Sequence, residues 1–389
     1  MNPITLAAAV RRFPLLGRPR PACPSLVERV QEIADIAHAA RQDGADRLNE
    51  GAHALNKAAL IASDSGMPDL ARDLCWQHID LYRDLCRTAG HPLTVLHARY
   101  MLEPVLNLAR LQIRASDGEQ ALQLLTAMFQ AVRSNTDLVV EGRTLPLTNI
   151  TGTRQEHHKL REWVWLHLVG DGIRTLALAG RWDDAVAHAH AHRGIGLHLM
   201  EGRQAAIVAR CMAGDLTAAR AALTESTPEQ PWELQVASCL NVMCPDTDST
   251  SASRATAAMI EHFVERQPMP GYAAFRAQLG LTVTTLASAT DPNATSRILV
   301  QVADEVIKSG DGYAAREVLR YHGIQANLTS TQYAALTDRL DASGLGVGTL
   351  PEPLLQNLLG STQAAVEALD SSLRRPGQPQ SEVDRELAP

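Results

Sequence analysis

The chain has 389 residues, of which 45% are hydrophobic and only 4% aromatic, and its formal net charge is −7 at pH 7. Acidic and basic residues are interspersed, so the basic stripe typical of a nucleic-acid-binding surface is missing and we expect no nucleic-acid partner. No run of about eighteen apolar residues occurs, which excludes a membrane-spanning helix and predicts no membrane partner.

Residues 1–25 are rich in proline and arginine, and we expect this segment to be loosely held. Its short apolar run ends at Arg11 and Arg12, which leaves too little for an export signal and predicts a cytoplasmic protein. In a reducing compartment cysteines act as small buried hydrophobes, and we favour this role over disulfides. The six cysteines are Cys23, Cys75, Cys86, Cys211, Cys239 and Cys244.

Residues 26–133 have the composition and apolar spacing of helices. A capping-box pattern at Ser25–Glu28 predicts a helix start, and 26–90 is expected to hold three helices, the last ending at His91 and Pro92. The next predicted hairpin joins Leu93–Arg114 to Glu119–Arg133.

Residues 136–152 interrupt the helical pattern. Leu138–Leu147 has β-branched residues on both sides of Glu141 and Gly142, which predicts a small β-hairpin or flap. Insertions in helical-repeat proteins often lie on the binding face. A long connector without such a role is the alternative.

Helical patterns resume at Thr153 and continue almost to the end. Two hairpins are predicted, from Thr153–Leu178 with Asp183–His192 and from Leu197–Met212 with Thr217–Leu223. Thr227 followed by proline and Gln230 predicts a further helix start, and Cys244–Ser251 is predicted as a loop.

The last predicted helices occupy residues 252–345, with breaks at Pro268–Gly271 and Asp291–Pro292. We therefore expect one helical-repeat domain over 26–365, with the flap at 136–152 inserted in it. Residues 366–389 are polar and are predicted to form a disordered tail.

One short pattern recurs between the predicted helices. A glycine is followed five positions later by an alanine that opens a new apolar run. Glycine can take the left-handed conformation that ends a helix, and a small alanine lets the next helix pack closely. The copies are Gly66–Ala71, Gly180–Ala185, Gly214–Ala219 and Gly310–Ala315, with a looser copy at Ser116–Ala121.

Gly180 and Gly214 are 34 residues apart, which is the period of a tetratricopeptide repeat. Gly180-Arg-Trp182-Asp-Asp-Ala185 resembles the turn between the two helices of that repeat. The other spacings are not multiples of this period, so the chain resembles degenerate tetratricopeptide-like proteins of actinobacterial type.

This resemblance implies an all-α, right-handed α–α solenoid of roughly fourteen to eighteen helices, with more than about 60% helix. Strands are expected only within 138–147. An irregular helical bundle with glycine-rich turns is the alternative.

Motifs for catalysis or cofactor binding are missing from the sequence. There is no Walker loop, no Gly-x-Gly-x-x-Gly and no Gly-x-Ser-x-Gly. His188 and His192 are four residues apart and could share a metal ion, but no acid or cysteine follows at a ligand spacing. We expect no cofactor and no metal.

Candidate ligand-binding residues cluster around the flap and the central hairpins. His158, Arg161 and Trp165 are spaced to share one stripe of the 153–178 helix, where a donor, a forked cation and a flat ring could hold an extended peptide. Arginines of the central hairpins could grip peptide carboxylates. The predicted set is Arg143, His157, His158, Arg161, Trp165, Arg174 and Arg203.

These observations favour a non-enzymatic helical-repeat scaffold that binds a peptide or protein partner, with a regulatory role and a homodimer left open. The alternative is an enzyme, or the partner of an enzyme, that acts on a peptide in a natural-product biosynthetic pathway. The flap and the His157–His158 pair are the features that support the alternative.

Overall fold

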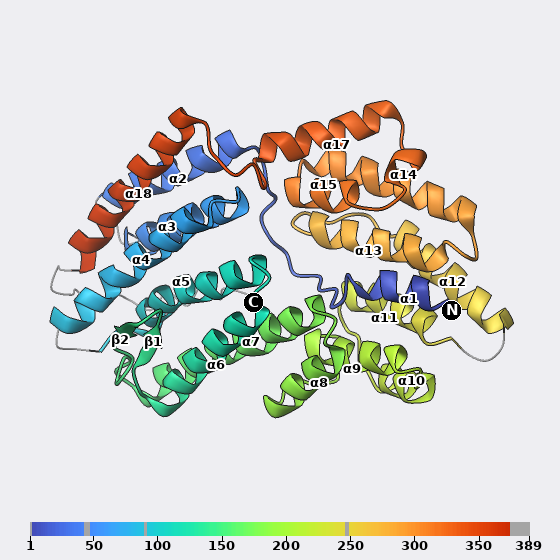
Figure 1. Ribbon diagram of the computed structural model, residues 1–389, viewed down its shortest axis with the longest axis horizontal. Helices are drawn as coiled ribbons and strands as arrows, with labels where there is room; N and C mark the ends of the chain where they lie inside the picture. Colours follow the sequence, from blue (N-terminus) through green and yellow to red (C-terminus); the bar gives the residue numbers. More distant parts are fainter. Residues whose placement is uncertain (1, 43–46, 89–91, 246–248, 374–389) are drawn as a thin grey trace. The chain divides into compact units, whose positions relative to one another are not determined.

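A computed structural model describes residues 2–42, 47–88, 92–245 and 249–373 (Figure 1). It is 73% helix, and across those ranges it has eighteen α-helices and one two-stranded sheet. The all-α prediction and the predicted helix content are therefore confirmed.

Contacts between residues divide the chain into two compact units. Unit 1 consists of residues 1–25 and 169–343, and unit 2 consists of residues 26–168 and 344–389. Helix α7 (Arg154–Leu178) contributes to both, with residues up to Leu168 in unit 2.

Unit 2 packs a C-terminal helix against the first helices of the same unit. Figure 1 shows α18 in red alongside α2 in blue, and α18 also contacts α3 and α4. One apolar core runs through all of these helices, with Tyr82 and Met101 fully buried. The elements are α2 (Leu26–Arg41), α3 (Arg47–Asp64), α4 (Pro68–Thr88), α5 (Val95–Arg114), α6 (Gly118–Ser134), β1 (Leu138–Val140), β2 (Arg143–Leu145), the first part of α7, and α18 (Glu352–Leu373).

Helices α3 and α5 run parallel and share a polar seam. Their paired side chains are Asn49 with Tyr100, Asn56 with Asn107, and Ser63 with Arg114. In each pair the α5 residue is 51 positions after the α3 residue. Successive pairs are seven residues, or about two helical turns, apart. The constant offset means that α3 and α5 run in the same direction along their whole contact.

Unit 1 holds the remaining helices. These are α1 (Pro3–Val10), the end of α7, α8 (Trp182–Ala191), α9 (Glu201–Met212), α10 (Leu216–Thr224), α11 (Pro231–Met243), α12 (Ser249–Val264), α13 (Ala273–Ala287), α14 (Pro292–Ser309), α15 (Gly312–Leu319), α16 (Ile324–Asn327) and α17 (Ser330–Ser343).

The expectation that residues 1–25 are loosely held is wrong. Leu15 is fully buried, and its N–H donates to the Gln204 side chain at 2.8 Å while Gln204 Nε2 donates back to the Leu15 carbonyl at 2.7 Å. The Gly312 N–H donates to the Cys23 carbonyl at 2.8 Å. Buried backbone groups need such partners, so the segment is an integral part of unit 1.

The recurring turns behave as predicted. Gly66, Gly180, Gly214 and Gly310 all have left-handed φ between 67° and 80° at helix ends, and the alanines of all five copies are at most 1% exposed. In the looser copy Ser116 takes the glycine position with φ 64°. Asp117, Asp215 and Asp311 then cap the following helices.

Several predicted boundaries need correction. The helix predicted to start at Thr227 begins at Pro231, because Gln230 and Glu233 form the capping box instead. α9 begins at Glu201 rather than Leu197. The predicted loop after Cys244 ends by Ser249, where α12 begins, and its residues 246–248 lie outside the described part.

The predicted tail also begins too early. Residues 366–373 belong to α18, and Ala368 and Leu369 are buried. Only residues 374–389 of that predicted tail lie outside the described part of the chain.

Candidate functional site

The predicted ligand-binding residues are divided between the two units. Arg143, His157, His158, Arg161 and Trp165 belong to unit 2, whereas Arg174 and Arg203 belong to unit 1. The seven therefore do not form one site within either unit.

The predicted α7 stripe is present at the surface of unit 2. Arg161 Nη2 lies 3.1 Å from His158 Nδ1, and both residues are exposed. Trp165 is half-buried against the core. The ring of Trp163 lies 5.9 Å from the guanidinium of Arg99 on α5.

The β1–β2 flap is fixed to helix α4. Glu141 and Gly142 both have positive φ, as the tight turn of such a hairpin requires. The Glu141 carboxylate accepts hydrogen bonds from Arg72 Nε at 2.9 Å and from the Trp76 indole at 2.7 Å. The Arg143 guanidinium covers the Trp76 ring at 4.4 Å and lies 3.5 Å from Asp80.

These contacts form one edge of an open hollow of about 630 Å³ in unit 2, here called the α4 groove. One stripe of α4 provides most of its lining. The rest comes from Arg143 of the flap and Leu359 of α18. The α4 residues follow helical spacing, so they share one face. They are Leu70, Asp73, Leu74, Trp76, Gln77, Asp80, Leu81 and Asp84.

The α4 groove combines apolar and acidic surface. Among the residues that the structure describes, its lining includes three carboxylates and one guanidinium, that of Arg143. Asp80 pairs with Arg83 at 3.0 Å and with Arg143 at 3.5 Å. Asp73 and Asp84 are exposed to solvent. Leu359 is 37% exposed. This arrangement suits a segment that carries positive charges beside apolar side chains.

The two predicted arginines of unit 1 have structural roles. Arg203 is buried, and its Nη2 donates to the Ala222 carbonyl at 2.7 Å, which satisfies the end of α10. Arg174 lies 3.7 Å from Glu201, a buried carboxylate that also pairs with Arg18 at 3.0 Å. The guanidinium of Arg203 is therefore engaged within the fold, and its role in ligand binding stays a prediction.

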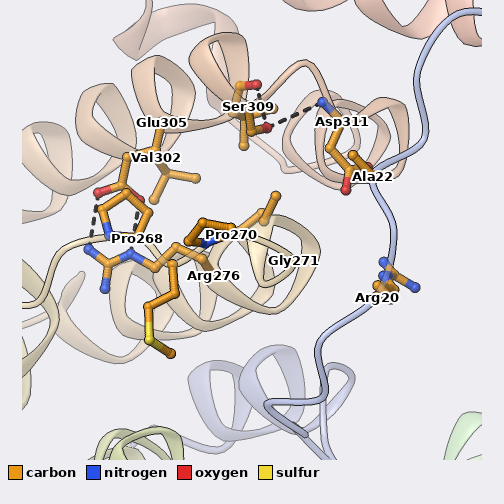
Figure 2. Close-up of a pocket in the computed structure, with 14 residues that line it drawn as sticks. Arg20, Ala22, Pro268, Pro270, Gly271, Arg276, Val302, Glu305, Ser309 and Asp311 are labelled. Carbon is orange, nitrogen blue, oxygen red and sulfur yellow. Dashed lines mark hydrogen bonds and ion pairs between the residues drawn. The ribbon is translucent and has the colours of Figure 1, made fainter. Parts of the chain in front are cut away.

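Unit 1 contains a partly open cavity of about 270 Å³ between the Pro268–Gly271 loop, α13 and α14 (Figure 2). Figure 2 shows Arg276 and Glu305 at one end of it, joined by two hydrogen bonds of 2.8 and 3.0 Å. The Arg276 guanidinium also lies 3.6 Å from the ring centre of Phe263. The sequence showed no motif for this cavity, since its lining is distant along the chain.

Most polar groups of this cavity are already engaged by the protein, whereas the buried Nη1 of Arg276 has no hydrogen-bond partner among the described residues. Glu305 also accepts from Gln301 at 2.9 Å. Asp311 caps α15 through the N–H groups of Tyr313 and Ala314, and its own N–H donates to Ser309 at 3.2 Å. The cavity therefore offers mainly apolar surface, whereas exposed charge is found at the α4 groove.

A half-buried carboxyl lies in the polar seam of unit 2. Glu103 on α5 accepts from Asn56 Nδ2 at 3.4 Å. Burial raises the pKa of Glu103 to about 7, although the nearby guanidiniums of Arg110 and Arg99 act in the opposite direction. This carboxyl changes charge near neutral pH, within a seam that joins two hairpins.

The histidine cluster of α8 brings two imidazole rings together. The rings of His188 and His192 are 4.6 Å apart. Within the described ranges, no group of three or more His, Cys, Asp or Glu side chains could hold a metal ion. Likewise no helix in those ranges is long and apolar enough to cross a membrane.

Comparison with protein-family models, with curated proteins and with solved structures gave no match. The candidate site therefore rests on the geometry of this chain.

Proposed function

We propose that the protein is a binding scaffold that holds a basic, partly apolar peptide segment in the α4 groove. The observation that carries the proposal is the stripe of α4 on which Leu70, Leu74 and Leu81 alternate with Asp73, Asp80 and Asp84 along a hollow. Leucines give apolar contact, and carboxylates favour partners of positive charge.

The dimensions fit a short segment. From Leu70 to Asp84 the helix rises about 21 Å at ~1.5 Å per residue. An extended peptide covers that length with about six residues at ~3.3 Å each. The flap and α18 contribute lining on either side of this helix face, which supports the expectation that the insertion belongs to the binding surface.

The proposal includes a finer description of the fold. We infer that α3–α4 and α5–α6 are consecutive hairpins of a tetratricopeptide-like stack. The support is the parallel seam of α3 and α5, with its constant offset of 51 residues, because alternate helices of such a stack run parallel.

The test is selection of a random peptide library of ~12 residues on phage against the full chain, followed by anisotropy titration of the enriched peptides. We expect enrichment in lysine and arginine beside apolar residues. The variant D73N/D84N removes two exposed charges without changing shape, and it should weaken binding tenfold or more.

Two controls locate the site. D338N/D341N removes two exposed charges from α17 in unit 1 and should leave binding unchanged. H158A/R161A removes the predicted α7 stripe. If that variant loses binding while D73N/D84N keeps it, the site is the α7 stripe; enrichment of acidic peptides would contradict the proposal outright.

A further inference from the structure

Two cysteines of unit 1 lie in direct contact. Cys211 is in the last turn of α9 and Cys244 caps the end of α11, and their sulfur atoms are 3.0 Å apart. Unbonded sulfur atoms in van der Waals contact lie further apart than this. A disulfide bond is ~2.05 Å long, so an approach of about 1 Å would join them.

The two thiols differ from the other buried cysteines in their electrostatics. The hydrogen bond with Cys211 lowers the pKa of Cys244, burial opposes this, and Arg220 adds to the lowering. The same contact and burial raise the pKa of Cys211. By comparison, burial raises the pKa of Cys75 and of Cys239 to about 12. Thiolate is the reactive form, which makes Cys244 the first nucleophile of the pair.

We propose that Cys211 and Cys244 form a redox pair that hydrogen peroxide converts into an intramolecular disulfide. The Cys244 thiolate attacks one peroxide oxygen, the O–O bond breaks, and hydroxide leaves to give a sulfenic acid. The Cys211 thiol then attacks the Cys244 sulfur, an S–S bond forms, and the sulfenic oxygen leaves as water. Two thiols and one peroxide thus give one disulfide and two waters.

The consequence for the fold is a covalent link around α10. The bond would join the end of α9 to the end of α11, between two cysteines that are 33 positions apart in the chain. Because both sulfurs are already in contact, neither helix has to move far. The link should therefore be formed in the folded chain without loss of structure.

The test treats the full chain with hydrogen peroxide, blocks remaining thiols under denaturing conditions, and maps the peptides by mass spectrometry. The six thiols of the chain should fall to four, with a Cys211–Cys244 cross-link that dithiothreitol reverses. The oxidised protein should melt at a higher temperature than the reduced protein. Mapping the unmodified sequence needs no variant, so a folding defect cannot obscure the result.

Two variants sharpen the outcome. C239S removes a buried cysteine outside the pair, and it should form the same cross-link. C244S should form none under the same treatment. Recovery of Cys211 and Cys244 unlinked at peroxide doses that oxidise other cysteines, or linked to other cysteines, would overturn the proposal.

Discussion

The half-buried carboxyl of Glu103 should make the stability of unit 2 depend on pH. Its pKa is raised from 4.5 to about 7 by burial, so the fold favours the protonated form. The stabilisation from this proton is therefore complete below the pKa of the unfolded chain and is lost as pH rises through about 7. A difference of about 2.5 pKa units corresponds to about 3 kcal/mol.

The substitution Glu103→Gln tests this dependence. Glutamine keeps the shape of the side chain and the acceptor for Asn56, but it does not ionise. Between about pH 5 and pH 8 the wild type should lose about 2–3 kcal/mol of unfolding free energy relative to the variant. Urea denaturation followed by circular dichroism and tryptophan fluorescence measures both proteins. Taking their difference cancels the other titrating groups.

The matched control is Glu261→Gln, at an exposed position of α12 in unit 1, which should follow the wild type at both pH values. If Glu103→Gln and the wild type lost the same unfolding free energy between the two pH values, Glu103 would not be an acid whose pKa is raised in the fold. A larger loss in the variant would reverse the sign of the argument.

Two further predictions concern the recurring turns, both measured by urea denaturation. Ala185→Leu should destabilise unit 1 by about 1–3 kcal/mol through overpacking, because Ala185 is fully buried, whereas Ala187→Leu at an exposed position of the same helix should cost little. Gly214→Ala should cost about 1 kcal/mol, because its φ of 79° disfavours a side chain although the space is open. Gly360→Ala, in the helical interior of α18, should instead stabilise; equal effects of the two glycine variants would refute the conformational argument.

The helices and their turns were predictable because their signals are local. A left-handed residue, the aspartate that caps the next helix and the small alanine all lie within six consecutive residues, as at Gly214 and Gly310. Even Ser116 could be recognised from the pattern around it, although a left-handed serine is unfavourable by itself. The capping box at Gln230 was missed because Thr227 offers a competing pattern three residues earlier.

Contacts between distant segments were not predictable in this way. Nothing near Leu359 indicates that α18 packs against α2, α3 and α4, and nothing in residues 1–25 indicates that Gln204 binds Leu15. Trp163 and Trp165 illustrate the same limit within one helix. They differ by about 200° around the axis, and only the position of α5 decides which ring meets Arg99.

The α4 groove depends on both kinds of information. Its acidic stripe is local, since helical spacing alone places Asp73, Asp80 and Asp84 on one face. The depth of the groove cannot be predicted from local sequence, because Arg143 and Leu359 come from segments far along the chain. Exposed ion pairs contribute little affinity each, so a bound peptide must gain most of its free energy from the apolar lining, with the carboxylates selecting for charge. The leucines should therefore determine mainly the dissociation rate of a bound segment. The aspartates should determine mainly the association rate and the preference for basic segments.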